Sequence, residues 1–301
     1  MSVVVLGSAN LDVVIALQRI PSPGETVLTD TISRGCGGKG ANQAVAVARS
    51  GAPTTFLGAV GNDDAGRMLL DGLAGAGADV SAVRRTDGSS GTAYVMVDAQ
   101  GENAIVVIGG ANAGYTDLTE AEADIIRRAD VLLMQFEVPI ETVTAAASIA
   151  RAAGVQVMLN AAPYAELPAD LLENLDLLIV NEHEAALSAG TQGTPEEVAT
   201  VILGSVPGVL ITLGAAGSLL ATRGTEPVRI NAPHVTAVDT TGAGDTFSGA
   251  YAAATVEGLP AVERLRFASA AAALAVQERG AVDAIPDRAR IDEALRHYYP
   301  G

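Results

Sequence analysis

The sequence predicts a doubly wound α/β fold, in which a mostly parallel sheet is flanked by helices. Short runs of Val, Ile and Leu alternate with alanine-rich segments along most of the 301 residues. Such runs are typical of strands that are buried on both faces of a parallel sheet. The expected strands are Val3–Leu6, Thr55–Ala59, Val131–Gln135, Gln156–Asn160, Leu177–Val180 and Val209–Leu213.

The segments between these strands carry apolar residues at helical spacing. One stripe runs from Ala41 to Ala48 at positions i, i+3, i+4 and i+7, and a similar stripe runs from Leu265 to Val276. A stripe of this kind indicates a helix with one face turned toward a core. Strands and helices therefore alternate as a parallel α/β sheet requires.

Two segments, Asp12–Arg34 and Thr92–Ile108, interrupt this alternation. Both are rich in Val, Ile and Thr with polar interruptions, which favours extended strands without helices between them. We expect residues 1–301 to form a single α/β domain with a small β-sheet lid, built from two insertions at about 12–34 and 92–108. A lid of this kind can exclude water from a reacting site.

Composition excludes several classes of function. The formal charge of −17 and the aromatic content of 3%, without Trp, argue against nucleic acid as a partner. The single cysteine, Cys36, excludes an internal disulfide and agrees with a reducing compartment. The sequence carries no basic leader and no apolar run long enough for a membrane segment, so we expect a cytoplasmic protein. His183, His234 and His297 lie too far apart for ligand-like spacing.

The segment Thr240–Ala250 carries the clearest chemical signal. Its glycine-rich turn, Gly242-Ala243-Gly244, precedes Asp245 at the start of an expected helix. Bare N–H groups at a helix N-terminus can hold an anionic phosphate, and a carboxylate there can accept the proton of an attacking hydroxyl. The alternative is an ordinary helix whose first turn is stabilised by Asp245.

A second glycine cluster spans Gly35–Gln43 and leads into the first expected helix. Its G-x-G-x-x-G spacing matches a dinucleotide fingerprint, but such a fingerprint normally follows the first strand. A Walker A loop fails because Lys39 is followed by glycine. Exposed N–H groups together with Lys39 and Asn42 suit polyol recognition instead. Asn10 and Asp12, at the end of the first strand, supply further donors and acceptors.

Together these motifs resemble the ribokinase family of carbohydrate kinases over essentially the whole chain. The resemblance implies ATP-dependent phosphorylation of D-ribose at the 5-hydroxyl, with Mg²⁺ and an activating K⁺. It also implies the predicted fold and a homodimer that forms through the lid. The segments that carry the resemblance are Gly7-Ser8-Ala9-Asn10-Leu11-Asp12, Pro23-Gly24-Glu25-Thr26, Gly37–Ala44, Asn181-Glu182-His183-Glu184, Thr212-Leu213-Gly214 and Asp239–Gly249.

The resemblance also implies roles for single residues. Asp245 matches the catalytic base, and Gly242, Ala243 and Gly244 match the anion hole. The ribose-binding positions that it implies are Asn10, Asp12, Gly38, Lys39, Asn42, Glu137 and Asp245. The nucleotide-binding positions that it implies are Asn181, Glu184, Thr212, Gly214, Gly217, Gly244 and Ser269.

Two cation sites follow from the same resemblance. Glu184 would position Mg²⁺ through water, although Asn181 and Glu184 also fit a helix capping box when the residues are taken alone. Some members of the family carry a serine at the position of Ala284, so one side-chain ligand for K⁺ is missing in this chain. The monovalent-cation positions that the resemblance implies, mostly through backbone oxygens, are Asp239, Thr241, Ala275, Glu278, Gly280 and Ala284.

Other substrates fit the same motifs. Deoxyribose, a ketohexose and a nucleoside are alternatives, although the scarcity of aromatic residues disfavours a pocket for a nucleoside base. A non-catalytic sugar-binding protein is a more distant alternative. Such a protein would be free to lose Asp245 or the glycine turn, and this chain has both. Fold and motifs do not by themselves separate ribose from these substrates.

Overall fold

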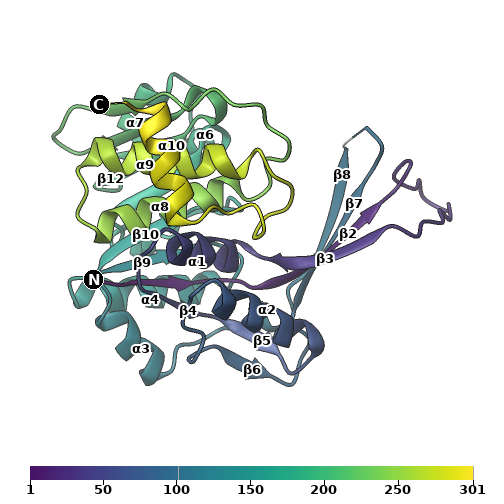
Figure 1. Cartoon of the computed structure of the whole chain (residues 1–301). Coiled ribbons are helices and arrows are strands. Elements are labelled where there is room, and N and C mark those ends of the chain that lie inside the picture. The colour runs from purple at the N-terminus through teal and green to yellow at the C-terminus, as the bar shows by residue number, and fades with distance from the viewer. Residues whose placement is uncertain (101, 301) are drawn as a thin grey trace.

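A central sheet organises the fold (Figure 1). Its strands are β1 (Val3–Leu6), β4 (Thr54–Leu57), β9 (Val131–Met134), β10 (Gln156–Asn160), β11 (Leu177–Asn181), β12 (Gly208–Thr212), β13 (Ser218–Thr222) and β14 (Val228–Ile230). The computed structural model describes residues 1–100 and 102–300, and the order of this sheet is β14-β13-β12-β11-β10-β9-β1-β4. The pairs from β4 to β12 are parallel, whereas β13 and β14 pair antiparallel at one edge.

The strands of this sheet present alternate residues to its two faces. In β1, Val3 and Val5 join the core on one face, whereas Val4 and Leu6 join the core on the other. All four side chains are at most 2% exposed. Burial on both faces explains why such strands are continuous apolar runs in the sequence.

Helices cover both faces of the sheet. One layer consists of α1 (Lys39–Arg49), α2 (Asp64–Gly75), α8 (Ala243–Val256), α9 (Ala261–Ala275) and α10 (Arg288–Tyr298). The other layer consists of α3 (Glu120–Arg127), α4 (Ile140–Ala152), α5 (Ala169–Leu172), α6 (Glu182–Ala189) and α7 (Pro195–Ile202). The predicted doubly wound fold is confirmed, and the two predicted helical stripes lie in α1 and at α9.

A second sheet has its base against α1 and α2, and its far end projects away from the helices (Figure 1). Its four strands, in spatial order, are β3 (Ile32–Gly37), β2 (Asn10–Ala16), β7 (Gly91–Val97) and β8 (Asn103–Ile108). The two segments expected to be extended supply these strands, but β2 begins earlier than expected, at Asn10. The base of the second sheet therefore contains Asn10 and Asp12, directly after the first strand of the central sheet.

Several short strands depart from the prediction. The expected strand Thr55–Ala59 is divided, because β4 ends at Leu57 and β5 (Ala59–Gly61) pairs with β6 (Arg84–Thr86) in a separate sheet. The break lies at Gly58, where a Cβ atom would come within 2.5 Å of a backbone oxygen of Gly7. β6, β13 and β14 are absent from the predicted strands. Within the described ranges, no helix is long and apolar enough to cross a membrane.

Candidate active site

The helix that carries Asp245 packs directly against α1. Gly249 in α8 permits this approach, since a Cβ atom there would lie 2.6 Å from both Cβ of Ala46 and the backbone oxygen of Gln43. α8 begins after Gly242, whose φ of 73° lies in the left-handed region that favours glycine. These two glycines bring the first turn of α8 beside α1, with the carboxylate of Asp245 directed at that helix.

The carboxylate of Asp245 is buried and held by two amides. Only 5% of the residue is exposed. Nδ2 of Asn42 donates to Oδ2 at 3.0 Å, and Nε2 of Gln43 donates to Oδ1 at 2.9 Å. Burial raises the pKa of Asp245, while the charge of Lys39 and the two amide bonds oppose that rise. Each carboxylate oxygen keeps a further lone pair, so the group can still accept a proton from a bound hydroxyl.

Glu137 joins three segments of the site. Its Oε2 accepts a bond from Oγ of Ser8 at 2.6 Å, from the backbone N–H of Lys39 at 3.0 Å and from Nδ2 of Asn10 at 3.4 Å. Lys39 is the first residue of α1, and the N-cap residue Gly38 has no side chain with which to satisfy the helix N–H groups. Glu137 therefore caps α1 from a distance and holds Asn10 close to the start of that helix.

Asp12 is the third acid of this cluster. Burial, and then the negative charges of Glu137 and Asp245, raise the pKa of Asp12 to about 6. A Cβ atom on Gly37 would lie 2.0 Å from Oδ2 of Asp12, so a glycine there leaves room for the carboxylate. The residues predicted to contact the sugar lie on β2, at the start of α1, after β9 and at the start of α8: Asn10, Asp12, Gly38, Lys39, Asn42, Glu137 and Asp245.

A cavity of about 380 Å³ opens at the N-terminus of α8. The residues predicted to bind the nucleotide that line it are Thr212, Gly214, Gly217, Gly244 and Ser269. Most of its other walls are apolar and come from Ala232, Pro233, Val235, Ala237, Phe247, Ala272, Ala273 and Val276. His234 also lies in the wall. An apolar cavity that ends at a helix N-terminus suits a ligand with a flat apolar part and an anionic part.

Asn181 and Glu184 form a capping box at the start of α6. Oδ1 of Asn181 accepts a bond from the N–H of Glu184 at 2.8 Å, and Oε2 of Glu184 accepts one from the N–H of Asn181 at 2.9 Å. The box uses one of the two carboxylate oxygens of Glu184. Asn181 pairs in register with Thr212, so the box begins beside a strand end that lines the cavity.

The residues predicted to hold a monovalent cation lie before α8, at the end of α9 and in the segment after α9. The carboxylate of Asp239 accepts bonds from the N–H groups of Thr241 at 2.9 Å and Gly280 at 3.0 Å. Burial alone would raise the pKa of Asp239, but these bonds hold that pKa below its usual value. The ionised side chain thus ties the loop before α8 to the loop after α9.

Three other members of this predicted set belong to α9 and to the segment that follows it. Ala275 ends α9, and its carbonyl accepts the N–H of Glu278 at 3.1 Å. The Glu278 side chain pairs with Arg290 at 2.6 Å, and Ala284 is 2% exposed. The side chains of Ala275 and Ala284 carry no oxygen, so these two positions can offer a cation only their backbone carbonyls. Among the described residues, no cluster of three or more His, Cys, Asp or Glu is arranged to hold a metal ion.

Two buried amides are missing from the predicted site. Gln43 bonds directly to Asp245, and Asn112 donates to Oδ1 of Asn10 at 2.7 Å. Gln43 belongs to the second glycine cluster and follows Asn42, so its place in the sequence could have indicated it. Asn112 belongs to the 3₁₀ turn Gly110–Asn112, 102 positions from Asn10, and no local signal marks it.

Comparison with known proteins gives one consistent result. A model described as "pfkB family carbohydrate kinase" matches residues 1–288. Ribokinase of Schizosaccharomyces pombe is 38% identical to the chain over 97% of this chain and 96% of its own length. The structure of Arabidopsis thaliana ribokinase complexed with ribose and ATP superposes with a TM-score of 0.93 at 37% identity, covering 98% of each chain. A less similar relative is deoxyribokinase of Salmonella typhi, 32% identical over 98% of this chain and 99% of its own length.

Proposed function

The chain belongs to the pfkB family of carbohydrate kinases and is a phosphotransferase, and from this premise we propose that it transfers the γ-phosphoryl group of ATP to the 5-hydroxyl of D-ribose. One observation carries the proposal. Asp245 lies buried between the cluster of Asn10, Asp12 and Glu137 and the cavity at the N-terminus of α8. A sugar on one side and a nucleotide on the other would thus meet at a carboxylate.

The transfer is a direct in-line displacement. The oxygen of the sugar hydroxyl forms a bond to the γ-phosphorus, and the bond from that phosphorus to the β,γ-bridging oxygen breaks, leaving its electron pair on ADP. The hydroxyl proton passes to the Asp245 carboxylate. The N–H groups of Gly242 and Gly244 would stabilise charge on the transferring group, and that of Ala243 would join them on leaving the Thr240 carbonyl, which accepts it at 3.2 Å. Glycine at position 244 leaves open space beside these groups.

The polar groups around Asp245 suit a polyol. Oδ1 of Asn42 is buried and has no hydrogen-bond partner within the described part of the chain, while Nδ2 of the same residue is committed to Asp245. Asn42 therefore presents an acceptor that a sugar hydroxyl can satisfy. Asp12 and Glu137 add carboxylate acceptors, and Lys39 adds a donor with positive charge close to Asp245.

ATP binding would use the apolar cavity for adenine and the start of α8 for phosphate. Mg²⁺ would be held mainly by the nucleotide phosphates and water, with Glu184 as the nearby carboxylate, because this ion dehydrates reluctantly. K⁺ would rest on backbone oxygens of the loops that Asp239 ties together, and it would fix the loop before the anion hole. Use of ATP also fits a cytoplasmic enzyme.

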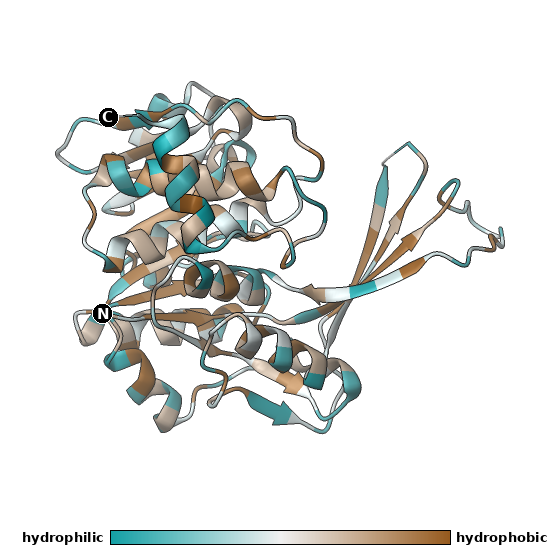
Figure 2. Ribbon diagram, viewed as in Figure 1, coloured by the Kyte–Doolittle hydropathy of each residue, from teal (hydrophilic) through white to brown (hydrophobic). Residues whose placement is uncertain are grey.

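We also propose that the second sheet pairs two copies of the chain. Its edge strand β8 exposes Ile105, Val106, Val107 and Ile108 by 48–56% each, and Tyr94 on β7 is 39% exposed. Figure 2 shows hydrophobic residues along these strands, away from the helices. Consecutive exposed apolar residues on an unpaired edge are costly unless another surface covers them. Val106→Lys should shift the sedimentation coefficient to that of a monomer, whereas Val201→Lys, on an exposed face of α7, should not.

A second acceptor has specific support. The Salmonella typhi relative named deoxyribokinase covers this chain almost completely, so 2-deoxyribose is the alternative substrate. The two sugars differ by one hydroxyl, and a site that hydrogen-bonds a hydroxyl can reject the analogue that lacks it by a large factor. The ratio of kcat/KM for the two sugars therefore decides between them.

A coupled ADP-release assay tests the proposed function. Purified protein with MgATP should turn over ribose faster than deoxyribose, fructose, tagatose or adenosine, and K⁺ should raise the rate. Asp245→Asn should lower kcat by at least about 100-fold with little change in ribose affinity. Asp64→Asn, an exposed acid in the first turn of α2, should leave kcat unchanged. Near-normal turnover of Asp245→Asn would overturn the role of the base.

A further inference from the structure

Gln43 lies at the centre of a buried chain of side-chain amides next to Asp245. Its Nε2 donates to Oδ1 of Asp245 at 2.9 Å and to Oδ1 of Asn160 at 3.0 Å. Its Oε1 accepts from Nε2 of Gln135 at 2.6 Å. Gln43 and Gln135 are both 0% exposed. Gln43 therefore cannot contact a bound sugar, and any effect it has on the reaction must pass through Asp245.

The orientation of the Gln43 amide is fixed from both ends. Nδ2 of Asn160 donates to the backbone carbonyl of Ile179 at 3.1 Å, and a carbonyl oxygen can only accept. Oδ1 of Asn160 must therefore face Gln43 as an acceptor. The ionised carboxylate of Asp245 can also only accept, so the NH₂ group of Gln43 is directed between two acceptors. A rotation of the amide by 180° would set its oxygen against both of them.

Gln135 completes this lock. With the Gln43 NH₂ group committed, Oε1 of Gln43 needs a donor, and Gln135 supplies it. The space for Gln135 comes from Gly7, where a Cβ atom would lie 1.9 Å from Oε1 of Gln135. Gln135 directly follows β9 and Asn160 ends the neighbouring strand β10, so two strands of the rigid sheet hold the amide of a helix.

We infer that Gln43 is a positioning residue for the base: its locked amide holds the Asp245 carboxylate in one orientation, with a lone pair left for the sugar hydroxyl. This inference rests on the proposed function and deepens it. Asn42 holds the other oxygen of the same carboxylate from the preceding position of α1. Two adjacent residues of one helix thus fix both oxygens, which a catalytic carboxylate needs because small misplacements are costly in rate.

Loss of the Gln43 donor should also change the protonation of Asp245. The charged groups that act on this carboxylate are Lys39, Glu137 and Asp12, and burial raises its pKa while the amide of Gln43 opposes the rise. Gln43→Met keeps the length of the side chain and removes the donor. The pKa of Asp245 should rise in this variant, so the acid limb of the kcat/KM profile should move to higher pH.

Steady-state kinetics of Gln43→Met test the inference. We expect kcat to fall by about 10- to 100-fold while the sugar KM stays within about threefold. In an Asp245→Asn background the same change should have little further effect, because the group that Gln43 positions is already gone. Gln135→Met, which leaves the bond to Asp245 intact but unlocks the amide, should move kcat in the same direction by a smaller factor. A kcat of Gln43→Met within about twofold of wild type, or an equal loss in the Asp245→Asn background, overturns the inference.

Two further experiments separate the proposed role of Gln43 from an effect on stability and from the choice of substrate. Thr142→Val removes the bond from a buried hydroxyl to the carbonyl of Tyr115, 2.6 Å, on the other face of the sheet, and should lower the melting temperature without lowering kcat. If ribose is not turned over, the proposed function fails, yet the inference is still decided without turnover. The carboxyl ¹³C signal of Asp245 in aspartate-labelled protein, identified by its loss in Asp245→Asn, should titrate at higher pH in Gln43→Met. An unchanged titration would overturn the inference.

Discussion

Asn112 donates a hydrogen bond of 2.7 Å to Oδ1 of Asn10, and the amide that makes this bond cannot turn over. Oδ1 of Asn112 accepts the backbone N–H of Ala9 at 3.0 Å, and its Nδ2 also contacts the Ala9 carbonyl at 3.2 Å. The peptide of Ala9 therefore dictates which end of Asn112 is the donor. Oδ1 of Asn10 must face that donor, so its Nδ2 is left to point toward Glu137.

Removal of Asn112 should weaken sugar binding more than it slows transfer. Asn112→Ala leaves Asn10 free to rotate, and the Ala9 peptide loses two buried bonds. We expect the ribose KM to rise by about tenfold and kcat to change by less than about threefold, because Asp245 is untouched. Asn174→Ala, at a partly exposed amide that bonds only to the carbonyl of Asp170, is the matched control and should change neither value. A kcat loss as large as the KM change would contradict this account.

Asp12 should lower stability at neutral pH. Its pKa is raised to about 6 in the folded chain. Above that pH the carboxyl is ionised in both states, but ionisation is less favourable in the folded chain, which lowers the free energy of unfolding. Asp12→Asn should therefore raise the free energy of unfolding by on the order of 2 kcal/mol at pH 7.5. The gain should shrink as the pH falls from 6 toward 4, because the folded carboxyl is then protonated while the unfolded chain gains progressively less from ionisation. It should vanish only below the unfolded pKa of 3.8, where the carboxyl is protonated in both states. Urea unfolding at pH 7.5 and pH 4.5 measures it, with Asp87→Asn, at an exposed aspartate, as the control.

The close packing of α1 and α8 should not tolerate an added methyl group. In Gly249→Ala the new Cβ would lie 2.6 Å from Ala46 and from the Gln43 backbone, so the two helices must separate. We expect a loss of about 1–3 kcal/mol in unfolding free energy and a lower kcat, since the helices carry Asp245 and its amide partners. Gly75→Ala is the matched control, because a Cβ on that helical glycine meets nothing within 4 Å. It should gain up to about 1 kcal/mol.

The elements that could be predicted are those whose burial shows in their own residues. The strands β1, β9 and β10 are apolar runs because helices pack on both of their faces. The turn before Asp245 could be predicted because its own residues include two glycines. β6 reads Arg-Arg-Thr, and its pairing with β5 is decided by residues more than 20 positions away, so its sequence carries no strand signal of its own.

The residues of the candidate site also fall into those with a local sequence signal and those without one. Glycines and charged residues in motifs could be assigned to a binding or catalytic role from the sequence. These roles stay predictions even where the residues line the same cavity. Gln43 and Asn112 act through partners 202 and 102 positions away, and an amide has no local pattern that reveals such a partner. Asn181 and Glu184 are different, because their local pattern predicts a helix capping box and the structure contains that box.

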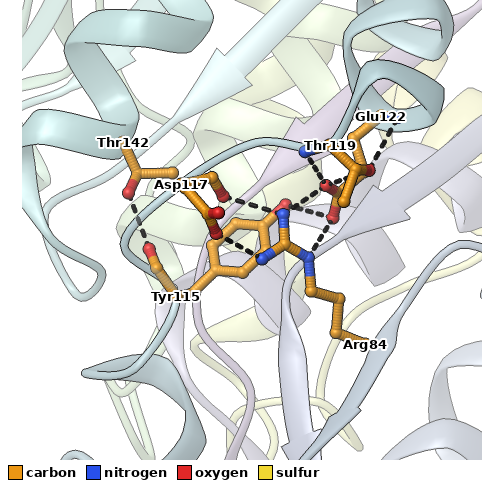
Figure 3. Close-up of polar contacts among 6 residues, drawn as sticks. All are labelled: Arg84, Tyr115, Asp117, Thr119, Glu122 and Thr142. Atoms are coloured by element: carbon orange, nitrogen blue, oxygen red, sulfur yellow. Dashed lines mark hydrogen bonds and ion pairs between the residues drawn. The ribbon is translucent and has the colours of Figure 1, made fainter.

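The ion pair of Arg84 and Glu122 links β6 to the segment that follows Asn112 (Figure 3). Glu122 is 2% exposed, and Nε of Arg84 donates to its Oε1 at 2.8 Å, the same oxygen that accepts from the hydroxyl of Tyr115 at 2.9 Å. Nη1 of Arg84 also reaches Asp117 at 2.7 Å, and its guanidinium lies 4.7 Å from the centre of the Tyr115 ring. Burial would raise the pKa of Glu122, but Arg84 and the bonds from Thr119 hold that pKa below its usual value.

Arg84→Met should therefore be strongly destabilising at neutral pH. It leaves the Glu122 carboxylate buried without its cation, a change that costs about 3–5 kcal/mol in comparable ion pairs. The depressed pKa of Glu122 stabilises the wild-type fold above its unfolded value near 4.5, and this contribution disappears as the pH falls through the folded value. The difference between wild type and variant should thus shrink in acid. Arg127→Met, whose exposed partners are Glu120 and Asp124, should cost far less than Arg84→Met at any pH, because solvent screens an exposed ion pair. Urea titrations of the three proteins between pH 4 and pH 8 decide the matter, and equal losses for Arg84 and Arg127 would mean that the buried pair is not what holds this segment.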